Sequence, residues 1–167
     1  WDKVYRVNKM TMWEPQQSVV QFVNRFIKKR IGYDVYDTKR SFTKALDLGC
    51  GNGSSVHFLA KNNFDVFGID ISQEALDIAQ NFLLKENLKA ILKKSSCDNL
   101  PFDNDFFDFI ICFGVLDHVD ISIAKKALDE VKRVLKTEGL FFCSLISTES
   151  TAFRKGREVG YNTFTID

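Results

Sequence analysis

Residues 44–54 read KALDLGCGNGS, and this stretch decides the fold. Its first five residues are mostly apolar and predict a short buried strand. Gly49, Gly51 and Gly53 then predict a sharp turn whose backbone can come close to a ligand, because glycine has no Cβ. Ser54 is of a residue type that often begins helices, so we expect it to cap a helix that runs to about Asn62.

The same alternation of strand and helix continues on both sides of this stretch. We expect further strands over 64–69, 90–92, 106–112 and 140–146, and helices over 15–30, 72–86 and 121–136. The run FFDFIIC at 106–112 is apolar almost throughout, which is typical of a strand covered on both faces. The pattern predicts an α/β fold, a Rossmann-like doubly wound sheet with helices on both faces.

Composition excludes several classes of function. The 167 residues suit one domain, and a net charge of +1 argues against a nucleic-acid partner. No stretch approaches the ~20 apolar residues that a membrane span needs, and no signal peptide opens the chain. The cysteines form no C-x-x-C pair, so we expect reduced thiols, no metal site and a cytoplasmic location. They are Cys50, Cys97, Cys112 and Cys143.

Two carboxylates indicate what the glycine turn binds. Asp47 lies two residues before Gly49, and Asp70 ends the second strand 17 residues after Gly53. A dinucleotide site would have G-x-G-x-x-G, whereas this turn is G-x-G-x-G and follows an acid that repels a pyrophosphate. S-adenosylmethionine carries an ammonium and a sulfonium but no phosphate. The charge pattern therefore favours S-adenosylmethionine over NAD, and an acid such as Asp70 can accept both ribose hydroxyls.

With these motifs the chain resembles the class I S-adenosylmethionine-dependent methyltransferases, and most of all their small-molecule branch with the ubiquinone and menaquinone enzymes. The likeness covers roughly residues 44–147, and it rests on five segments. They are 45–53 (ALDLGCGNG), 67–72 (FGIDIS), 99–109 (NLPFDNDFFDF), 110–119 (IICFGVLDHV) and 130–140 (EVKRVLKTEGL).

The resemblance implies an organisation for the chain. Residues 44–147 would form the S-adenosylmethionine-binding core with strand order 3-2-1-4-5, and residues 1–43 a helical cap. Residues 148–167 would be a connector or substrate-side loop, without the antiparallel strand pair that completes the sheet in relatives. The chain begins at Trp1 and not at Met, so we expect residues to be missing upstream.

The resemblance also implies roles for single residues. The cofactor's methionine end would lie at the turn, its ribose at Asp70 and its adenine near Ile71. Relatives often have Asp where this chain has Ser96, so the adenine amino group would donate a hydrogen bond to Ser96 or to Asp98. The full set of cofactor-binding residues would be Tyr5, Asp47, Gly49, Cys50, Gly51, Asp70, Ile71, Ser96, Cys97 and Phe113.

On the substrate side, the resemblance places Leu116, Asp117 and His118 near the methyl group, with His118 as a candidate general base. Tyr5 and Trp13 would close over the site. For both rings the alternative is hydrophobic anchoring, and for His118 it is packing at a helix start.

The implied activity is in-line transfer of a methyl group to a small molecule, with S-adenosylhomocysteine as the product. Residues 112–115 (CFGV) lack the Asn/Asp-Pro-Pro-aromatic motif of amino-group methyltransferases that act on adenine or glutamine. Two alternatives stay open: a non-catalytic S-adenosylmethionine-binding subunit and an NAD-dependent dehydrogenase. A homo-oligomer is also open, because an uncovered sheet edge promotes self-association.

Overall fold

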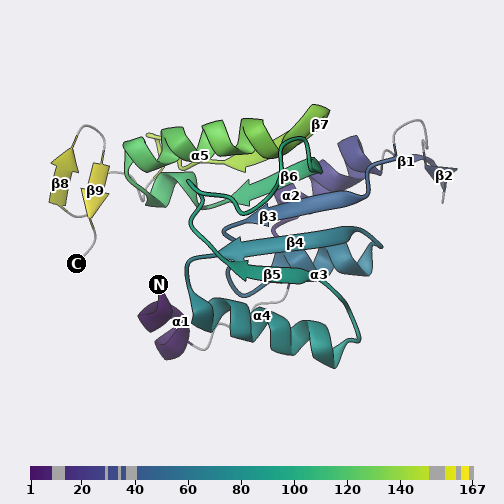
Figure 1. Ribbon diagram of the computed structural model, residues 1–167, viewed down its shortest axis with the longest axis horizontal. Coiled ribbons are helices and arrows are strands. Elements are labelled where there is room, and N and C mark those ends of the chain that lie inside the picture. Colours follow the sequence, from purple (N-terminus) through teal and green to yellow (C-terminus); the bar gives the residue numbers. More distant parts are fainter. Residues whose placement is uncertain are drawn as a thin grey trace.

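The computed structural model describes residues 1–8, 14–28, 30–33, 35–36, 41–150, 157–160 and 163–165. Its centre is a five-stranded sheet in the order β5-β4-β3-β6-β7 (Figure 1). All four pairings are parallel, and counted from β3 along the chain the order is 3-2-1-4-5, as expected. The strands are β3 (Lys44–Leu48), β4 (Asp65–Asp70), β5 (Ile91–Lys94), β6 (Phe107–Phe113) and β7 (Leu135–Ser144).

Helices cover both faces of the sheet, as the doubly wound prediction requires. One core cluster joins the sheet to α2, to the π-helical turn that continues it, and to α3 and α4. A second cluster packs α5 against the opposite face. The bounds are α2 (Gln17–Phe22), the π-helical turn (Val23–Ile27), α3 (Ser54–Lys61), α4 (Gln73–Lys85) and α5 (Ile121–Val134).

The parallel strands bring the important residues to one edge. In Figure 1 the arrowheads of β3, β4 and β6 point toward the side where the N-terminal helix α1 (Asp2–Asn8) lies. The glycine turn after β3, Asp70 at the end of β4 and the residues after β6 therefore meet beneath α1.

No helix in the described part of the chain is long and apolar enough to cross a membrane.

Three local predictions were wrong. The helix expected over 15–30 is α only to Phe22 and then widens into the π-helical turn. The N-cap of α3 is Gly53 and not Ser54, because the backbone enters the helix from a left-handed residue with φ 85°. The last predicted helix ends at Val134 and not at 136, because the chain turns directly into β7 and bulges there, with Glu138 at φ 63°.

Several short elements were not predicted. Helix α1 precedes the first predicted helix, and β1 (Arg30–Gly32) and β2 (Val35–Tyr36) form a two-stranded sheet within residues 1–43, which we expected to be a helical cap. Near the C-terminus, β8 (Arg157–Gly160) and β9 (Thr163–Thr165) pair antiparallel. That pair forms a sheet of its own and, among the described residues, does not extend the five-stranded sheet beyond β7.

Asp108 fixes the opposite end of the sheet. One of its carboxylate oxygens accepts from the backbone amides of Thr43 and Lys44, each at 2.8 Å, and the other accepts from Lys136 Nζ at 2.7 Å. These hydrogen bonds outweigh burial, so the pKa of Asp108 lies below its usual value. The ionised carboxylate thus joins the starts of β3 and β6 to the beginning of β7.

We expect Asp108→Ala to lower the free energy of unfolding by about 2–4 kcal/mol, because it leaves backbone donors without their charged acceptor. Since the folded-state pKa is lowered, this contribution is present above about pH 4 and is lost as the pH falls further. Urea unfolding at pH 7 and pH 3 measures both effects. Asp129→Ala, at an exposed position of α5, is the control, and equal losses for the two variants would contradict the role of Asp108.

Candidate functional site

The glycine turn is held in place by hydrogen bonds to the end of β4. The Cys50 amide donates to the Ile69 carbonyl at 2.8 Å, and the Gly51 amide donates to Asp70 Oδ2 at 2.8 Å. The other oxygen of Asp70 accepts from the Ser72 amide at 2.9 Å. A carboxylate has about four acceptor positions, so the half-buried Asp70 keeps room for two more donors.

Asp47 lies buried beneath the turn, with 4% of its surface exposed. Burial and, second, the charge of Asp70 raise the pKa of Asp47 to about 7, although a hydrogen bond from the Val56 backbone opposes the shift. The two carboxylates make this end of the sheet a place where a cation is favoured and an anion is repelled.

Helix α1 covers the two carboxylates. Burial and, second, the charge of Asp70 raise the pKa of Tyr5 to about 12, so its hydroxyl stays protonated. That hydroxyl lies so close to Gly51 that a Cβ there would be 2.5 Å from it, in addition to the strain of a φ of 52°. Ser72 Oγ donates to Asp2 at the start of α1, which ties the helix to the end of β4.

A cavity of about 190 Å³ lies between α1, the glycine turn and the ends of β4 and β6. Its described lining contains Asp70 and His118 but no lysine or arginine, the side chains that bind phosphate most often. At Gly49 the lining depends on glycine, because a Cβ would lie 2.3 Å from Val115 Cγ2. The cavity is therefore mainly apolar, with one carboxylate at its edge.

The turn after β5 forms another wall of this cavity. Ser96 and Cys97 both line it, and Cys97 is 7% exposed. The hydroxyl of Ser96 donates to the carboxylate of Asp98. Ser96 and Asp98, the two candidate acceptors for an adenine amino group, are therefore bonded to each other, and the Ser96 proton lies in that bond.

The segment after β6 closes the cavity on the side away from β5. The ring of His118 is exposed at the cavity mouth, where the cavity opens to solvent. The Trp1 ring lies edge-on to it, at a centroid distance of 5.8 Å and an angle of 88°. Asp117 Oδ2 accepts from the Ile146 amide at 3.2 Å. The other oxygen, Oδ1, is buried and has no hydrogen-bond partner in the described part of the chain.

The structure brings most predicted site residues together. Those that line the cavity are Tyr5, Gly49, Asp70, Ile71, Ser96, Cys97 and His118. Asp47, Cys50 and Gly51 lie behind this lining, and Phe113, 37% exposed, lies beside it at the end of β6. Trp13 falls outside the described residues.

Sequence reasoning missed several wall residues. The missed lining residues are Trp1, Ile69, Ser95, Val115, Val119 and Ile123. Val119 has extended backbone and precedes the N-cap Asp120, whereas Ile123 lies in the first turn of α5, so helical spacing does not signal that both line the cavity. Nothing in the sequence signalled Trp1, because its position depends on the packing of α1.

Comparison with known proteins gives consistent matches. The protein family described as "Methyltransferase domain" matches residues 45–139. The ubiquinone biosynthesis O-methyltransferase of Rickettsia bellii is 28% identical over 149 residues, which cover 86% of this chain and 61% of that protein. The chain spans 61–64% of the length of such curated relatives.

Solved structures also match this chain in fold. The PH0226 protein from Pyrococcus horikoshii OT3 superposes with a TM-score of 0.65 at 26% identity, over 84% of this chain and 64% of that one. A SAM-dependent methyltransferase from Methanosarcina mazei superposes with a TM-score of 0.55 at 31% identity, over 62% of this chain and 54% of that one.

The buried acid Asp47 predicts an unusual dependence of stability on pH. Its folded-state pKa is raised to about 7, so ionisation above its unfolded value near 4 destabilises the fold progressively until about pH 7. Asp47→Asn stays neutral and escapes this cost. We expect its melting temperature to equal that of the parent near pH 4 and to exceed it by roughly 5–10 °C at pH 8.

Differential scanning calorimetry across pH 4–8 measures this difference. Asp65→Asn, at the exposed start of β4, is the control and should follow the parent at every pH. If the difference in melting temperature between Asp47→Asn and the parent does not change with pH, the pKa of Asp47 is not raised in the folded protein.

Proposed function

Because the chain belongs to the class I S-adenosylmethionine-dependent methyltransferases, we propose that it binds S-adenosylmethionine in the cavity under α1 and transfers the methyl group to a small-molecule acceptor. The observation that carries the proposal is the carboxylate pair Asp47 and Asp70 at a cavity whose described lining has no lysine or arginine. Such a site fits a cationic nucleoside without phosphate and does not fit a dinucleotide.

Asp70 is our proposed ribose ligand. Its two oxygens each hold one backbone amide and each retain one acceptor position, which matches a vicinal diol. The amides of Gly51 and Ser72 fix the plane of the carboxylate, so little ordering is needed when the ribose binds.

From behind the cavity lining, Asp47 is our proposed source of negative charge for the ammonium at the methionine end. Its pKa of about 7 means that a cation nearby favours ionisation, so binding should release a proton at pH 6 and should tighten as the pH rises toward 8. The hydroxyl of Tyr5 above the turn and the neighbouring Trp1 ring, at 6.3 Å between centroids, would cover the bound sulfonium.

The adenine would lie between Ile71 and the turn after β5. Ile71 is 49% exposed and lines the cavity, so a flat ring against it would bury apolar surface. On the opposite side, the Cys97 backbone and the Ser96 hydroxyl would contact the ring edge.

When bound, S-adenosylmethionine supplies a methyl group on a sulfonium, which leaves as a neutral thioether. The chain therefore has to orient an acceptor in line with that methyl group, and orientation alone is worth about 7–11 kcal/mol of barrier. His118 stands at the cavity mouth and would take a proton from an acceptor hydroxyl or amine. Apolar residues such as Val119 and Ile123 beside it would hold the acceptor's apolar part and exclude water.

A small-molecule acceptor has two supports. The net charge of +1 offers no electrostatic footprint for nucleic acid. The relative from Rickettsia bellii is named for ubiquinone biosynthesis, and quinone precursors are small aromatic molecules.

We expect Asp70→Ala to weaken binding of S-adenosylhomocysteine at least tenfold, because the ribose loses its acceptors. Isothermal titration calorimetry measures the dissociation constant. Asp65→Ala, at the other end of β4, is the matched control and should bind like the parent. A parent protein that binds NADH but not S-adenosylhomocysteine would overturn the proposed function itself.

We expect His118→Ala to bind S-adenosylhomocysteine within twofold of the parent and to transfer methyl groups 10²–10⁴-fold more slowly, because it lacks the proton acceptor. The assay measures transfer of radiolabelled methyl groups to small-molecule fractions of a cell extract. Undiminished transfer by His118→Ala would remove the proposed role as a base, and a parent that binds cofactor but methylates no fraction would favour a non-catalytic subunit.

A further inference from the structure

The turn of residues 95–102 between β5 and β6 has two sides with different neighbours. Ser95, Ser96 and Cys97 line the cavity on one side. On the other side Cys97 and Leu100 are buried in the core cluster that contains the inner residues of α5. The contacts between α5 and this turn therefore help to set the positions of the residues that line the cavity.

Two charged residues of α5 grip this turn by its backbone. The Leu100 amide donates to Glu130 Oε2 at 2.7 Å, and the Leu100 carbonyl accepts from Arg133 Nη2 at 3.0 Å. Arg133 Nη1 also donates to the Phe102 carbonyl at 2.7 Å. The helix thus holds the amide and the carbonyl of one residue and the carbonyl of another.

Glu130 and Arg133 also hold each other. Arg133 Nε donates to Glu130 Oε1 at 2.7 Å, and Arg133 Nη2 donates to Oε2 at 2.8 Å. The hydrogen bonds from Arg133 lower the pKa of Glu130, so the pair stays charged at neutral pH. The planar guanidinium of Arg133 has several donors in fixed directions and therefore reaches a carboxylate and two carbonyls at once. The single ammonium of a lysine cannot replace it.

The grip continues through the turn to Ser96. The Asn99 amide donates to the Ser96 carbonyl at 3.2 Å, and Ser95 Oγ donates to the Asn99 carbonyl at 2.8 Å. Because the Ser96 hydroxyl gives its only proton to Asp98, it can offer just lone pairs to anything in the cavity. It is therefore suited to a group that donates a hydrogen bond.

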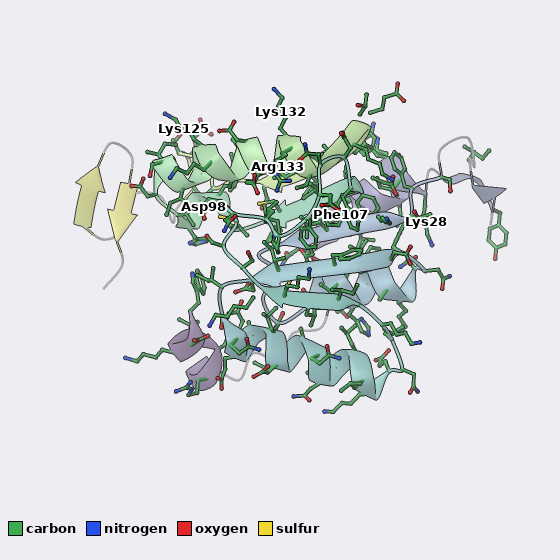
Figure 2. The ribbon with its side chains drawn as sticks, in the orientation of Figure 1. Lys28, Asp98, Phe107, Lys125, Lys132 and Arg133 are labelled. Atoms are coloured by element: carbon green, nitrogen blue, oxygen red, sulfur yellow. The ribbon has the colours of Figure 1, made fainter. Side chains whose placement is uncertain are left out.

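We propose that Glu130 and Arg133 are positioning residues for nucleobase recognition, which hold the 95–102 turn so that Ser96 Oγ accepts from the 6-amino group of the adenine. This inference rests on the proposed function and goes beyond it, because neither α5 residue touches the cavity. It makes the site selective for a 6-amino purine over a 6-oxo purine. In Figure 2 Arg133 and Lys132 are labelled on α5, and the exposed Lys132 serves as a neighbouring control.

The test compares S-adenosylhomocysteine with S-inosylhomocysteine, which differ only in the purine: the first has a 6-amino group and an acceptor N1, and the second has a 6-oxo group and an N1–H donor. Dissociation constants are measured by isothermal titration calorimetry for the parent and for Arg133→Lys, Glu130→Gln and Lys132→Met. We expect the parent and Lys132→Met to prefer the adenine ligand at least tenfold. In Arg133→Lys and Glu130→Gln the preference should fall below threefold, because the turn loses its register while the ribose and methionine contacts remain.

The ratio of the two constants separates positioning from general loss of structure, because unfolding weakens both ligands equally. Melting temperatures identify any variant that does not fold, and the two conservative substitutions touch different atoms, so each tests the proposal alone. A preference of tenfold or more in either variant would overturn the inference, as would a parent that binds both ligands equally. A parent that binds neither ligand would instead refute the proposed function.

Discussion

The hydrogen bond from the Gly51 amide to Asp70 joins the ends of two neighbouring strands, and the rest of the site depends on it. It fixes the glycine turn above Asp47, which sets the distance between two acids in a buried place. Their repulsion is tolerated because one carboxylate is bound by backbone amides and the other can hold a proton. The folded protein thus keeps two acids close together at a cost in free energy, and a bound cation would lower that cost.

The strand and glycine turn at 44–53 and the central α/β pattern could be predicted because their signals are local. Alternation of apolar runs with amphipathic helices defines a parallel sheet, and parallel strands bring their carboxyl ends to one edge. Asp47 and Asp70 then follow from their places at strand ends. The cap Ser72 was also predictable, since its side chain accepts from the Ala75 amide three residues later.

Other features depend on contacts between distant parts of the chain. Helix α1 packs over the site, but its seven residues carry too short a pattern to indicate this. The bulge at the start of β7 replaces the last turn of a helix whose periodicity would continue, because Leu135 pairs with Phe107. Glu130 and Leu100 are thirty residues apart, and no spacing rule connects a helix surface to the backbone of a preceding turn.

The hydroxyl of Ser72 serves two segments at once, since it accepts from the Ala75 amide and donates to Asp2. The exposed Arg6–Glu74 pair, at 3.4 Å, is a second polar contact between α1 and α4, and an exposed ion pair is worth little in water. Both contacts join the helix above the carboxylates to the start of α4. For a ligand bound beneath α1, we therefore expect entry and departure to require that α1 separate from α4, so that this internal rearrangement and not encounter in solution would limit exchange.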